Sequence, residues 1–264
     1  MTTALLGYTG FVGSTLLRQQ TFDQLYRANN IGDICGRAFE RVICAAAPGQ
    51  KWRANQNPEA DWQAIENLIG HLRTVSCRQF VLISTVDVFR EPHGVDENSP
   101  VLENGLHAYG LHRYRLEQFV EAHFPEALIV RLPGLVGPGL RKNVIFDLHN
   151  GNNLDAIDSR ALFQFYPMVN LSWDIQTALD ARLQRLHLSA QPISVGEVAR
   201  LGFGRTFSNR LTGPVAHYDL QSRHAQVFGS RGRYPYSFRD TVQAIRAYAQ
   251  SEPRTLPAVR DVHP

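Results

Sequence analysis

Two short segments of the sequence carry hydroxyl and cationic side chains that could transfer a proton together. Ser84 and Thr85 follow the apolar run at 80–83, which is typical of a strand buried on both faces of a parallel sheet. Ligands bind at the carboxyl edge of such a sheet, so we expect both hydroxyls there. Tyr109 opens a helix, and Arg113 lies one turn further along the same face. Because the positive charge favours the ionised phenol, this pair is suited to exchanging a proton with a substrate hydroxyl during hydride transfer.

A glycine-rich turn near the start of the sequence could hold a phosphate group. An apolar strand at 3–6 ends at Gly7, which permits a tight turn into a helix. Gly10 has no Cβ to block a pyrophosphate, and Gly13 lets the helix lie close against the strand. The free N–H groups and the positive dipole at the helix start then face the phosphates. The spacing predicts a dinucleotide-binding turn made by Gly7, Thr9, Gly10, Phe11, Val12 and Gly13. An ordinary strand–turn–helix is the alternative.

The elements that must position these residues follow one another in an α/β order. Strands are expected at 3–6, 22–27, 41–45, 80–83 and 127–132. Helices are expected after the glycine turn and at 61–74, 106–123, 143–149, 173–186, 194–201 and 236–249, with Ser172 as the cap of the helix at 173–186. Only 28–40 lies between the second and third strands, which is too short for a full crossover helix. A short loop must therefore hold the adenosine end of a bound dinucleotide.

Taken together, these motifs resemble those of the extended short-chain dehydrogenases/reductases, in the group of sugar-nucleotide epimerases/dehydratases and dTDP-4-dehydrorhamnose reductases. The other matching segments are Ala45 to Ala47 after an apolar strand, residues 84–89, Tyr109 with Gly110, and residues 131–138. The resemblance covers roughly the first 145 positions, and the rest of the chain matches only loosely. It implies a Rossmann-type doubly wound parallel sheet with a small C-terminal substrate-binding region. The dinucleotide-binding domain would take 1–132 and 167–195, and the substrate-binding region 133–166 and 196–264.

The resemblance also implies a role for each matching residue. Thr85 would bind the reacting sugar oxygen, and Tyr109 would be the general acid/base. Arg113 stands where the family has a lysine that binds the nicotinamide ribose and lowers the pKa of the tyrosine. Further cofactor contacts are expected from Ala45, Ala46, Ala47, Ser84, Tyr109, Arg113, Leu132, Pro133 and Gly134. Substrate contacts are expected from Asp87, Asn143, Gln164 and Tyr166, although the segment with Gln164 and Tyr166 could instead be an apolar edge strand.

The sequence departs from the family pattern at two helix positions. Arg113 replaces the lysine and keeps its charge, but a guanidinium cannot lose a proton. Asp61 stands at a position where the family often has a supporting asparagine. Three functions therefore stay open. One is an NAD(P)-dependent oxidoreductase or epimerase of a nucleotide-linked sugar, and another is a non-catalytic NAD(P)-binding regulator or scaffold that has lost the catalytic lysine. The third is hydride transfer to or from an unrelated small ketone, since the C-terminal half carries no specific motif.

The residues directly after Thr85 bear on the reaction type. Dehydratases of this group have an acidic pair directly after the hydroxyl residue, where this chain has Val86 and Asp87. Elimination of water needs both an acid and a base, so dehydration is the least favoured reaction. Asp87 could instead be a structural residue that turns away from the site.

The residues at the end of the second strand bear on the choice between NAD and NADP. Arg27 and Asn29 stand there in place of the acidic residue that would bind both ribose hydroxyls. A guanidinium suits a 2′-phosphate, so NADP is favoured over NAD, with a solvated loop as the alternative.

Composition excludes several other classes of protein. The 264 residues carry a net charge of only +3 and no block of like charges, so no nucleic-acid partner is expected. The three cysteines are scattered, which indicates reduced thiols and a cytoplasmic location. The ten histidines show no metal-ligand spacing, and those near Tyr109 are expected on the helix surface. No signal peptide or membrane span is expected. A homodimer through the helices at 61–74 and 106–123 is implied by the resemblance alone.

Overall fold

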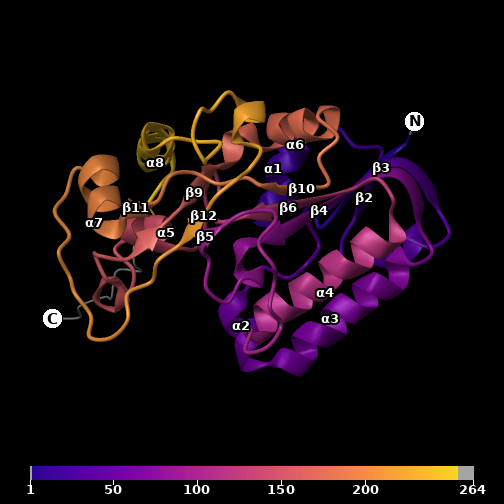
Figure 1. Ribbon diagram of the computed structural model, residues 1–264, viewed down its shortest axis with the longest axis horizontal. Coiled ribbons are helices and arrows are strands. Elements are labelled where there is room, and N and C mark those ends of the chain that lie inside the picture. The colour runs from indigo at the N-terminus through magenta and orange to yellow at the C-terminus, as the bar shows by residue number, and fades with distance from the viewer. Residues whose placement is uncertain (1, 255–264) are drawn as a thin grey trace, which may run out of the picture.

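A six-stranded, fully parallel sheet forms the centre of the molecule (Figure 1). The computed structural model describes residues 2–254. The two predicted domains include residue 1 and residues 255–264, and these lie outside the described residues. The sheet order is β10-β6-β4-β3-β1-β2. Its strands are β1 (Thr3–Leu6), β2 (Gln24–Tyr26), β3 (Ala38–Cys44), β4 (Ser76–Thr85), β6 (Ala127–Leu132) and β10 (Arg185–His187). The chain passes from β1 outward to β2 and returns to β3 on the other side of β1. This reversal is the switch point at which ligands bind in such sheets.

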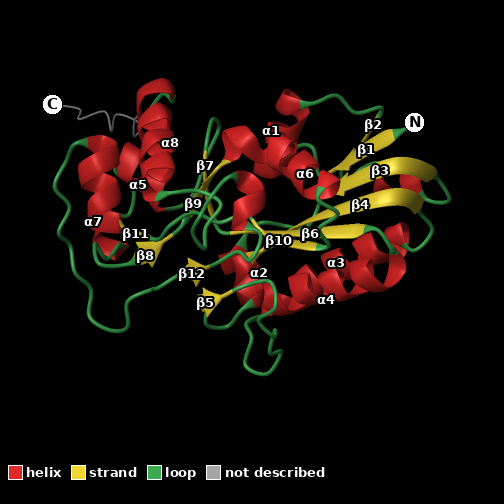
Figure 2. Ribbon diagram, turned by 45° about the horizontal axis from the view of Figure 1, so that its top comes forward, coloured by secondary structure: helices red, strands yellow, loops and turns green. Residues whose placement is uncertain are grey.

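Helices cover both faces of the sheet, which confirms the doubly wound α/β prediction (Figure 2). On one face, α3 (Pro58–Leu72) and α4 (Ala108–His123) pack apolar side chains against Leu6, Val42 and Leu82. On the other face, α1 (Phe11–Gln19) and α6 (Leu171–Asp180) pack on the alternate residues of the same strands. Successive strand residues point to opposite faces, so strands that are buried on both sides are mostly apolar. Every residue of β6 is buried, and its one charged side chain, Arg131, is paired with Glu117.

The connection between β2 and β3 contains no α-helix, as the short segment at 28–40 predicts. A single 3-10 turn at Ile31–Ile34 spans the gap, and Ile34 is fully buried under the sheet. Asn30 fixes the start of this turn, because its Oδ1 accepts from the Arg27 N–H at 2.7 Å and its Nδ2 donates to the Leu25 carbonyl at 3.0 Å. The abbreviated loop thus has a defined shape beside the end of β2.

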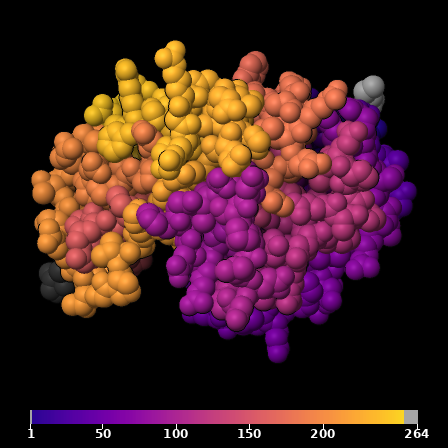
Figure 3. Space-filling model, viewed as in Figure 1, coloured from indigo at the N-terminus to yellow at the C-terminus, as the bar shows by residue number. Residues whose placement is uncertain are grey.

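The C-terminal part adds a third apolar cluster alongside the sheet. Its helices are α5 (Val144–Asn150), α7 (Val195–Glu197) with the π-helical turn Val198–Gly202, and α8 (Phe238–Ser251). Three two-stranded pieces join it to the rest: β7 (Gly134–Val136) with β9 (Phe165–Pro167), β8 (Leu162–Phe163) with β11 (Ile193–Ser194), and β5 (His93–Val95) with β12 (Asp219–Leu220). In the space-filling view, the orange and yellow C-terminal residues lie directly against the N-terminal part (Figure 3).

The helix predicted at 173–186 differs strongly from the structure. The helix expected at 173–186 begins at Leu171 and ends at Asp180, and Arg185–His187 forms the sixth strand instead. Arg182 adopts a left-handed φ of 54°, which breaks the helix and turns the chain back to the sheet. Ser172 is not the cap, since its N–H lies inside the helix and donates to Gln19 Oε1 at 2.9 Å. The segment around Tyr166 is strand β9, so the edge-strand alternative holds there.

Candidate functional site

The glycine turn brings the ends of β1 and β3 and the start of α1 together. Gly7 has a φ of 80°, and a Cβ on it would lie 2.3 Å from the Ala45 carbonyl oxygen. A Cβ on Gly13 would lie 2.1 Å from the Gly7 carbonyl oxygen, so both positions require glycine for the fold itself. Gly10 is different, because its Cβ would meet only the Gly7 oxygen at 3.5 Å. The absence of a side chain at Gly10 therefore leaves open space next to the start of α1, where no side chain caps the helix.

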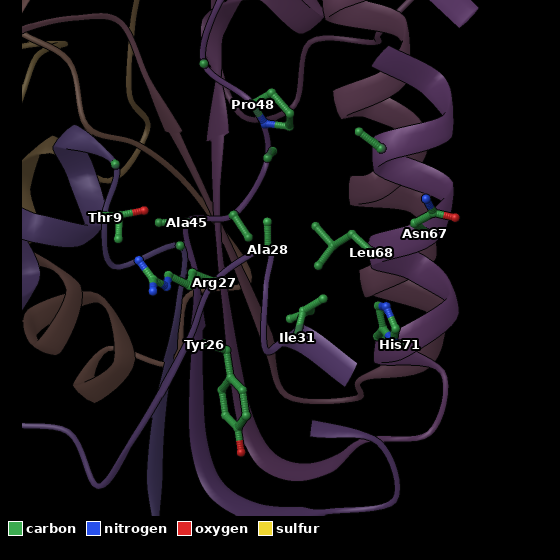
Figure 4. Close-up of a pocket in the computed structure, with 16 residues that line it drawn as sticks. Thr9, Tyr26, Arg27, Ala28, Ile31, Ala45, Pro48, Asn67, Leu68 and His71 are labelled. Atoms are coloured by element: carbon green, nitrogen blue, oxygen red, sulfur yellow. The ribbon is translucent and has the colours of Figure 1, made fainter. Parts of the chain in front are cut away.

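A cavity of about 560 Å³ opens beside this turn (Figure 4). Seven of the predicted cofactor residues line it, namely Gly7, Thr9, Gly10, Arg27, Ala45, Ala46 and Ala47. Sequence reasoning missed the rest of the lining, which is Tyr26, Ala28, Ile31, Pro48, Gly49, Ala64, Asn67, Leu68 and His71. These residues come from the end of β2, from the short loop after it, from the segment after β3 and from α3, and Leu68 and His71 of α3 lie on the cavity side in Figure 4. Their common signal is weak, since such residues in loops and on a helix face are ordinary.

Other predicted cofactor residues lie away from this cavity. Asn29 is exposed on the loop after β2, and Phe11 and Val12 pack with the cluster between α1 and the sheet. Ser84 is buried, and its hydroxyl donates to Glu117 Oε1. Arg131 donates to both oxygens of the same carboxylate. The Ser84 hydroxyl is therefore part of a buried network rather than of the cavity lining. The remaining residues outside the lining are Gly13, Tyr109, Arg113, Leu132, Pro133 and Gly134.

The structure brings the predicted hydroxyl and phenol near each other. Thr85 ends β4 and Tyr109 is the second residue of α4, and the Thr85 hydroxyl is close enough to lower the pKa of the Tyr109 phenol. The close approach depends on Gly110, where a Cβ would lie 2.0 Å from the Asp87 carbonyl oxygen. The Thr85 hydroxyl also accepts from the Asp87 N–H at 3.1 Å, which fixes its orientation. Two oxygen atoms that can bind and protonate one substrate oxygen thus stand at the carboxyl edge of the sheet.

Arg113 is held by Asp61, the other residue that departs from the family pattern. Its Nη2 donates to Asp61 Oδ1 at 2.8 Å and its Nη1 to Asp61 Oδ2, and both side chains are buried. The guanidinium also donates to the Pro48 and Tyr109 carbonyls, and its central carbon lies 4.0 Å from the centroid of the Tyr109 ring. Burial raises the pKa of Asp61, but the hydrogen bonds from Arg113 and His112 outweigh it and hold that pKa below its usual value.

The expected effect of Arg113 on Tyr109 is only partly present. Burial raises the pKa of the Tyr109 phenol, and this effect exceeds the lowering by the charge of Arg113 and by the hydrogen bond from Thr85. The lowering by Arg113 is therefore present as expected, but the net pKa of Tyr109 is raised, because burial disfavours the ionised phenol by more. A phenol of this kind is protonated at neutral pH and is suited to donate a proton.

Asp87 meets two side chains that sequence reasoning missed. Lys51, the first residue of α2 (Lys51–Gln56), places its Nζ 2.7 Å from Asp87 Oδ1. The Tyr218 hydroxyl, from the C-terminal part, lies 3.2 Å from the same oxygen and 3.4 Å from Nζ. Asp87 is thus directed to a charged cluster beside Thr85. The signal that could have found Lys51 is the rarity of lysine in this chain.

The two histidines near Tyr109 are structural rather than surface residues. His107 caps α4, with its Nδ1 accepting from the Gly110 N–H at 3.0 Å. His112 is buried, and its Nδ1 lies 2.7 Å from Asp61 Oδ2. The expectation of helix-surface histidines is therefore wrong for His112, because it shares the Asp61 carboxylate with Arg113. Within residues 2–254, no group of three or more His, Cys, Asp or Glu side chains could hold a metal ion.

Three predicted substrate residues have their polar atoms engaged within the protein. Asn143 caps α5, its Oδ1 accepting from Ile145 N–H at 2.9 Å. Gln164 is 1% exposed and donates to two backbone carbonyls, while its Oε1 accepts from the Leu220 N–H at 2.7 Å. Tyr166 is fully buried, and its hydroxyl donates to Asp174 Oδ2 at 2.5 Å. Gln164 and Tyr166 therefore stabilise the fold and present almost no surface to a ligand, contrary to expectation.

The fold is similar to that of several solved structures. RMD from Pseudomonas aeruginosa, complexed with NADPH, matches with a TM-score of 0.68 at 16% identity, over 95% of this chain and 99% of that chain. The dTDP-4-dehydrorhamnose reductase from Bacillus anthracis, in complex with NADP, matches at 0.70 and 17%, over 96% and 99%. MoeE5 in complex with UDP-glucose and NAD matches at 0.72 and 14%, over 95% and 99%. No protein-family model and no curated protein matches the sequence. At these identities the likeness shows the fold.

Proposed function

We propose that this chain is an NAD(P)-dependent oxidoreductase that acts on a nucleotide-linked sugar, with reduction of a ketone as the favoured direction. The observation that carries the proposal is the placement of Thr85 and Tyr109, at the end of β4 and the start of α4, at the same sheet edge as the glycine-turn cavity. Similarity in fold to proteins solved with NADPH, NADP, NAD or UDP-glucose supports the choice of cofactor and substrate class.

The cavity beside the glycine turn fits a dinucleotide. The space at Gly10 and the uncapped start of α1 suit a pyrophosphate, because free N–H groups and the helix dipole favour an anion there. The apolar residues Ile31 and Leu68 would hold the adenine, and Arg27 stands at the end of β2 near the expected ribose. No acidic residue is among the described residues that line the cavity. We therefore favour NADP over NAD.

The residues around Tyr109 support reduction more than epimerisation. A bound reduced nicotinamide would supply the hydride. Thr85 would hold the carbonyl oxygen of the substrate, and the Tyr109 phenol would give that oxygen a proton. Arg113, fixed by Asp61, would position the phenol ring from 4.0 Å. Because burial raises the pKa of Tyr109, the phenol starts in the protonated form that reduction needs. Epimerisation begins with proton removal and needs the ionised form.

The second candidate function is a non-catalytic NAD(P)-binding protein. It is favoured by one specific observation, which is that the Arg113 guanidinium is committed to Asp61 and to two backbone carbonyls. In that arrangement, Arg113 is unavailable as the proton relay that a lysine could provide. The two candidates share the cofactor site, so they differ only in turnover.

Binding and turnover test the proposal in sequence. NADPH and NADH are titrated by nicotinamide fluorescence and by thermal shift, since a ligand of the native state raises its stability. We expect NADPH to bind more tightly. Oxidation of NADPH is then followed with a panel of nucleotide-linked keto-sugars. Tyr109→Phe should bind NADPH unchanged and lose turnover, and equal turnover in this variant would exclude the mechanism. Binding without turnover of any substrate favours the regulator.

Three further expectations stay proposals. A homodimer would use the outer faces of α3 and α4, which lie side by side on one face of the sheet (Figure 1). The cytoplasmic location rests on Cys35, Cys44 and Cys77, all of which are free thiols. Within the described part of the chain, no helix is long and apolar enough to cross a membrane.

A further inference from the structure

Lysine is rare in this chain, and both lysines lie near the start of α2. Of the 27 Lys and Arg residues, only Lys51 and Lys142 are lysines. Lys51 begins α2, and Lys142 donates from Nζ to the carbonyl of Gly49, which precedes Lys51 by two residues. Arginine serves as the cation at every other basic position, even at Arg113. An amine differs from a guanidinium in being able to give up a proton.

The packing of α2 places Lys51 near the start of α4. Asn55 lies one turn after Lys51 on the same face of α2, and its Oδ1 accepts from the Tyr109 N–H at 3.0 Å. Asp87, which binds Lys51 at 2.7 Å, is in contact through its backbone with Gly110. Lys51 is therefore tied to the start of α4 from two sides. The charge of Lys51 also acts on the Tyr109 phenol.

We propose, on the basis of the proposed function, that Lys51 returns to Tyr109 the proton that Tyr109 gives to the substrate. After the phenol has protonated the substrate oxygen, an N–H bond of the Lys51 ammonium breaks and an O–H bond forms on Tyr109, with the proton passing across one water molecule. The neutral amine then takes a proton from solvent, which reaches it because the Lys51 side chain is 38% exposed. No electron donor or acceptor is needed beyond the hydride donor.

The groups that face Lys51 fit this role. They are Asp87 after β4, Tyr218 from the C-terminal part, and His107 and Tyr109 at the start of α4. Burial lowers the pKa of Lys51, but the charge of Asp87 and the contact with Tyr218 outweigh it and raise the net pKa. The Lys51 side chain is thus held in its protonated, ammonium form. Burial and the charge of Lys51 lower the pKa of His107, so this imidazole is neutral and is no competing source of protons.

A burst experiment tests the inference with Lys51→Arg, which keeps the charge and the pairing with Asp87. Each protein is loaded with NADPH and mixed with the keto-sugar that the wild type reduces, and NADPH absorbance is followed by stopped flow. Because Tyr109 carries its proton at the start, we expect a normal first turnover in Lys51→Arg. Later turnovers should slow by roughly a hundredfold, which is the low end for a lost proton-transfer group. Equal burst and steady-state rates in wild type and Lys51→Arg would overturn the inference.

Two controls separate this inference from the proposed function. Arg53→Met removes one positive charge from the exposed part of the same helix and should leave both phases unchanged. If Tyr109→Phe retains turnover, the proposed function fails. If Tyr109→Phe is inactive while Lys51→Arg turns over normally in both phases, only the role of Lys51 fails. A variant that loses the first turnover as well would indicate a substrate-binding role for Lys51 and would also overturn the inference.

The scarcity of lysine gives a second measurement that needs no turnover. Reductive methylation with labelled formaldehyde marks two lysine side chains, whose NMR signals report their pKa values separately. Replacing Asp87 by Asn should lower the pKa of Lys51, because the neighbouring negative charge is lost, and should leave Lys142 unchanged. An unchanged pKa at Lys51 would show that the ion pair with Asp87 does not control the amine and would contradict the inference.

Discussion

Asp61 and Arg113 form a buried, bidentate ion pair between α3 and α4, with Asp61 Oδ1 2.8 Å from Arg113 Nη2. Each residue departs from the pattern that the sequence resembles, and the structure shows that the two departures are partners. A guanidinium presents parallel N–H groups that match both oxygens of a carboxylate, whereas a lysine ammonium is a point charge without this fork geometry. The pair ties the helix of Tyr109 to the helix that lines the cavity.

Asp61→Ala should destabilise the protein strongly. The variant leaves the Arg113 guanidinium buried without a counter-charge, and breaking a buried pair in this way costs about 3–5 kcal/mol. Urea unfolding measures the loss. Exposed Glu66 on the same helix provides the control, since Glu66→Ala removes a carboxylate with no buried partner and should change stability little. Similar losses in both variants would argue against a special role for the pair.

Arg113→Lys should not improve the wild-type protein. A lysine cannot bind both Asp61 oxygens and the Pro48 carbonyl together, so we expect lower stability and slower turnover. The double variant Asp61→Asn/Arg113→Lys recreates the family pattern and should recover part of the loss. Thermal unfolding and NADPH oxidation report the two effects. Higher activity in Arg113→Lys alone would instead mark the natural chain as a degenerate enzyme.

Alanine substitutions at Gly10 and Gly13 should have different effects, the first on NADPH binding and the second on stability. A Cβ on Gly10 enters the cavity without meeting protein closer than 3.5 Å, so Gly10→Ala should cost about 1 kcal/mol or less in stability but weaken NADPH binding markedly. A Cβ on Gly13 would lie 2.1 Å from backbone, so Gly13→Ala should destabilise by roughly 1–3 kcal/mol. Unfolding curves and NADPH titration give both values. Unaltered binding in Gly10→Ala would place the dinucleotide elsewhere.

Arg27→Ala should reverse or remove the cofactor preference. If Arg27 binds a 2′-phosphate by charge-assisted hydrogen bonds, its loss should weaken NADPH binding roughly tenfold or more and leave NADH binding nearly unchanged. Arg37→Ala is the matched control, as a second exposed arginine that lies outside the cavity lining. Equal weakening of NADPH and NADH would assign Arg27 to a part that both cofactors share.

The stability should fall as the pH is lowered from about 6.5. His187 is fully buried beside Arg131, and burial, with the charge of Arg131, lowers its pKa to about 3. The unfolded chain therefore binds more protons than the native state between the ordinary pKa of histidine and pH 3, and stability is lost as the pH falls through this window. Urea unfolding at several pH values measures the slope. His187→Gln should flatten it, and an unchanged slope would assign the effect to other groups.

The sequence by itself determined the parts of the molecule that depend on local pattern. The apolar run before Ser84 predicts a buried strand, and the spacing of Gly7 and Gly13 predicts a close strand-to-helix turn; both are confirmed because sterics and side-chain alternation act within a few residues. The absence of a helix between β2 and β3 also follows from chain length alone. The pairing of Thr85 with Tyr109 was expected, since both lie at one sheet edge.

Only the tertiary structure decided the contacts between residues distant in sequence. The pairing of Asp61 with Arg113 and of Lys51 with Asp87 depends on how α2, α3 and α4 pack, which no local pattern specifies. The same holds for Tyr166, whose aromatic character fits a cleft or a core equally well until Asp174 is placed beside it. The raised pKa of Tyr109 likewise results from burial, and burial is set by neighbours across the fold rather than along the chain.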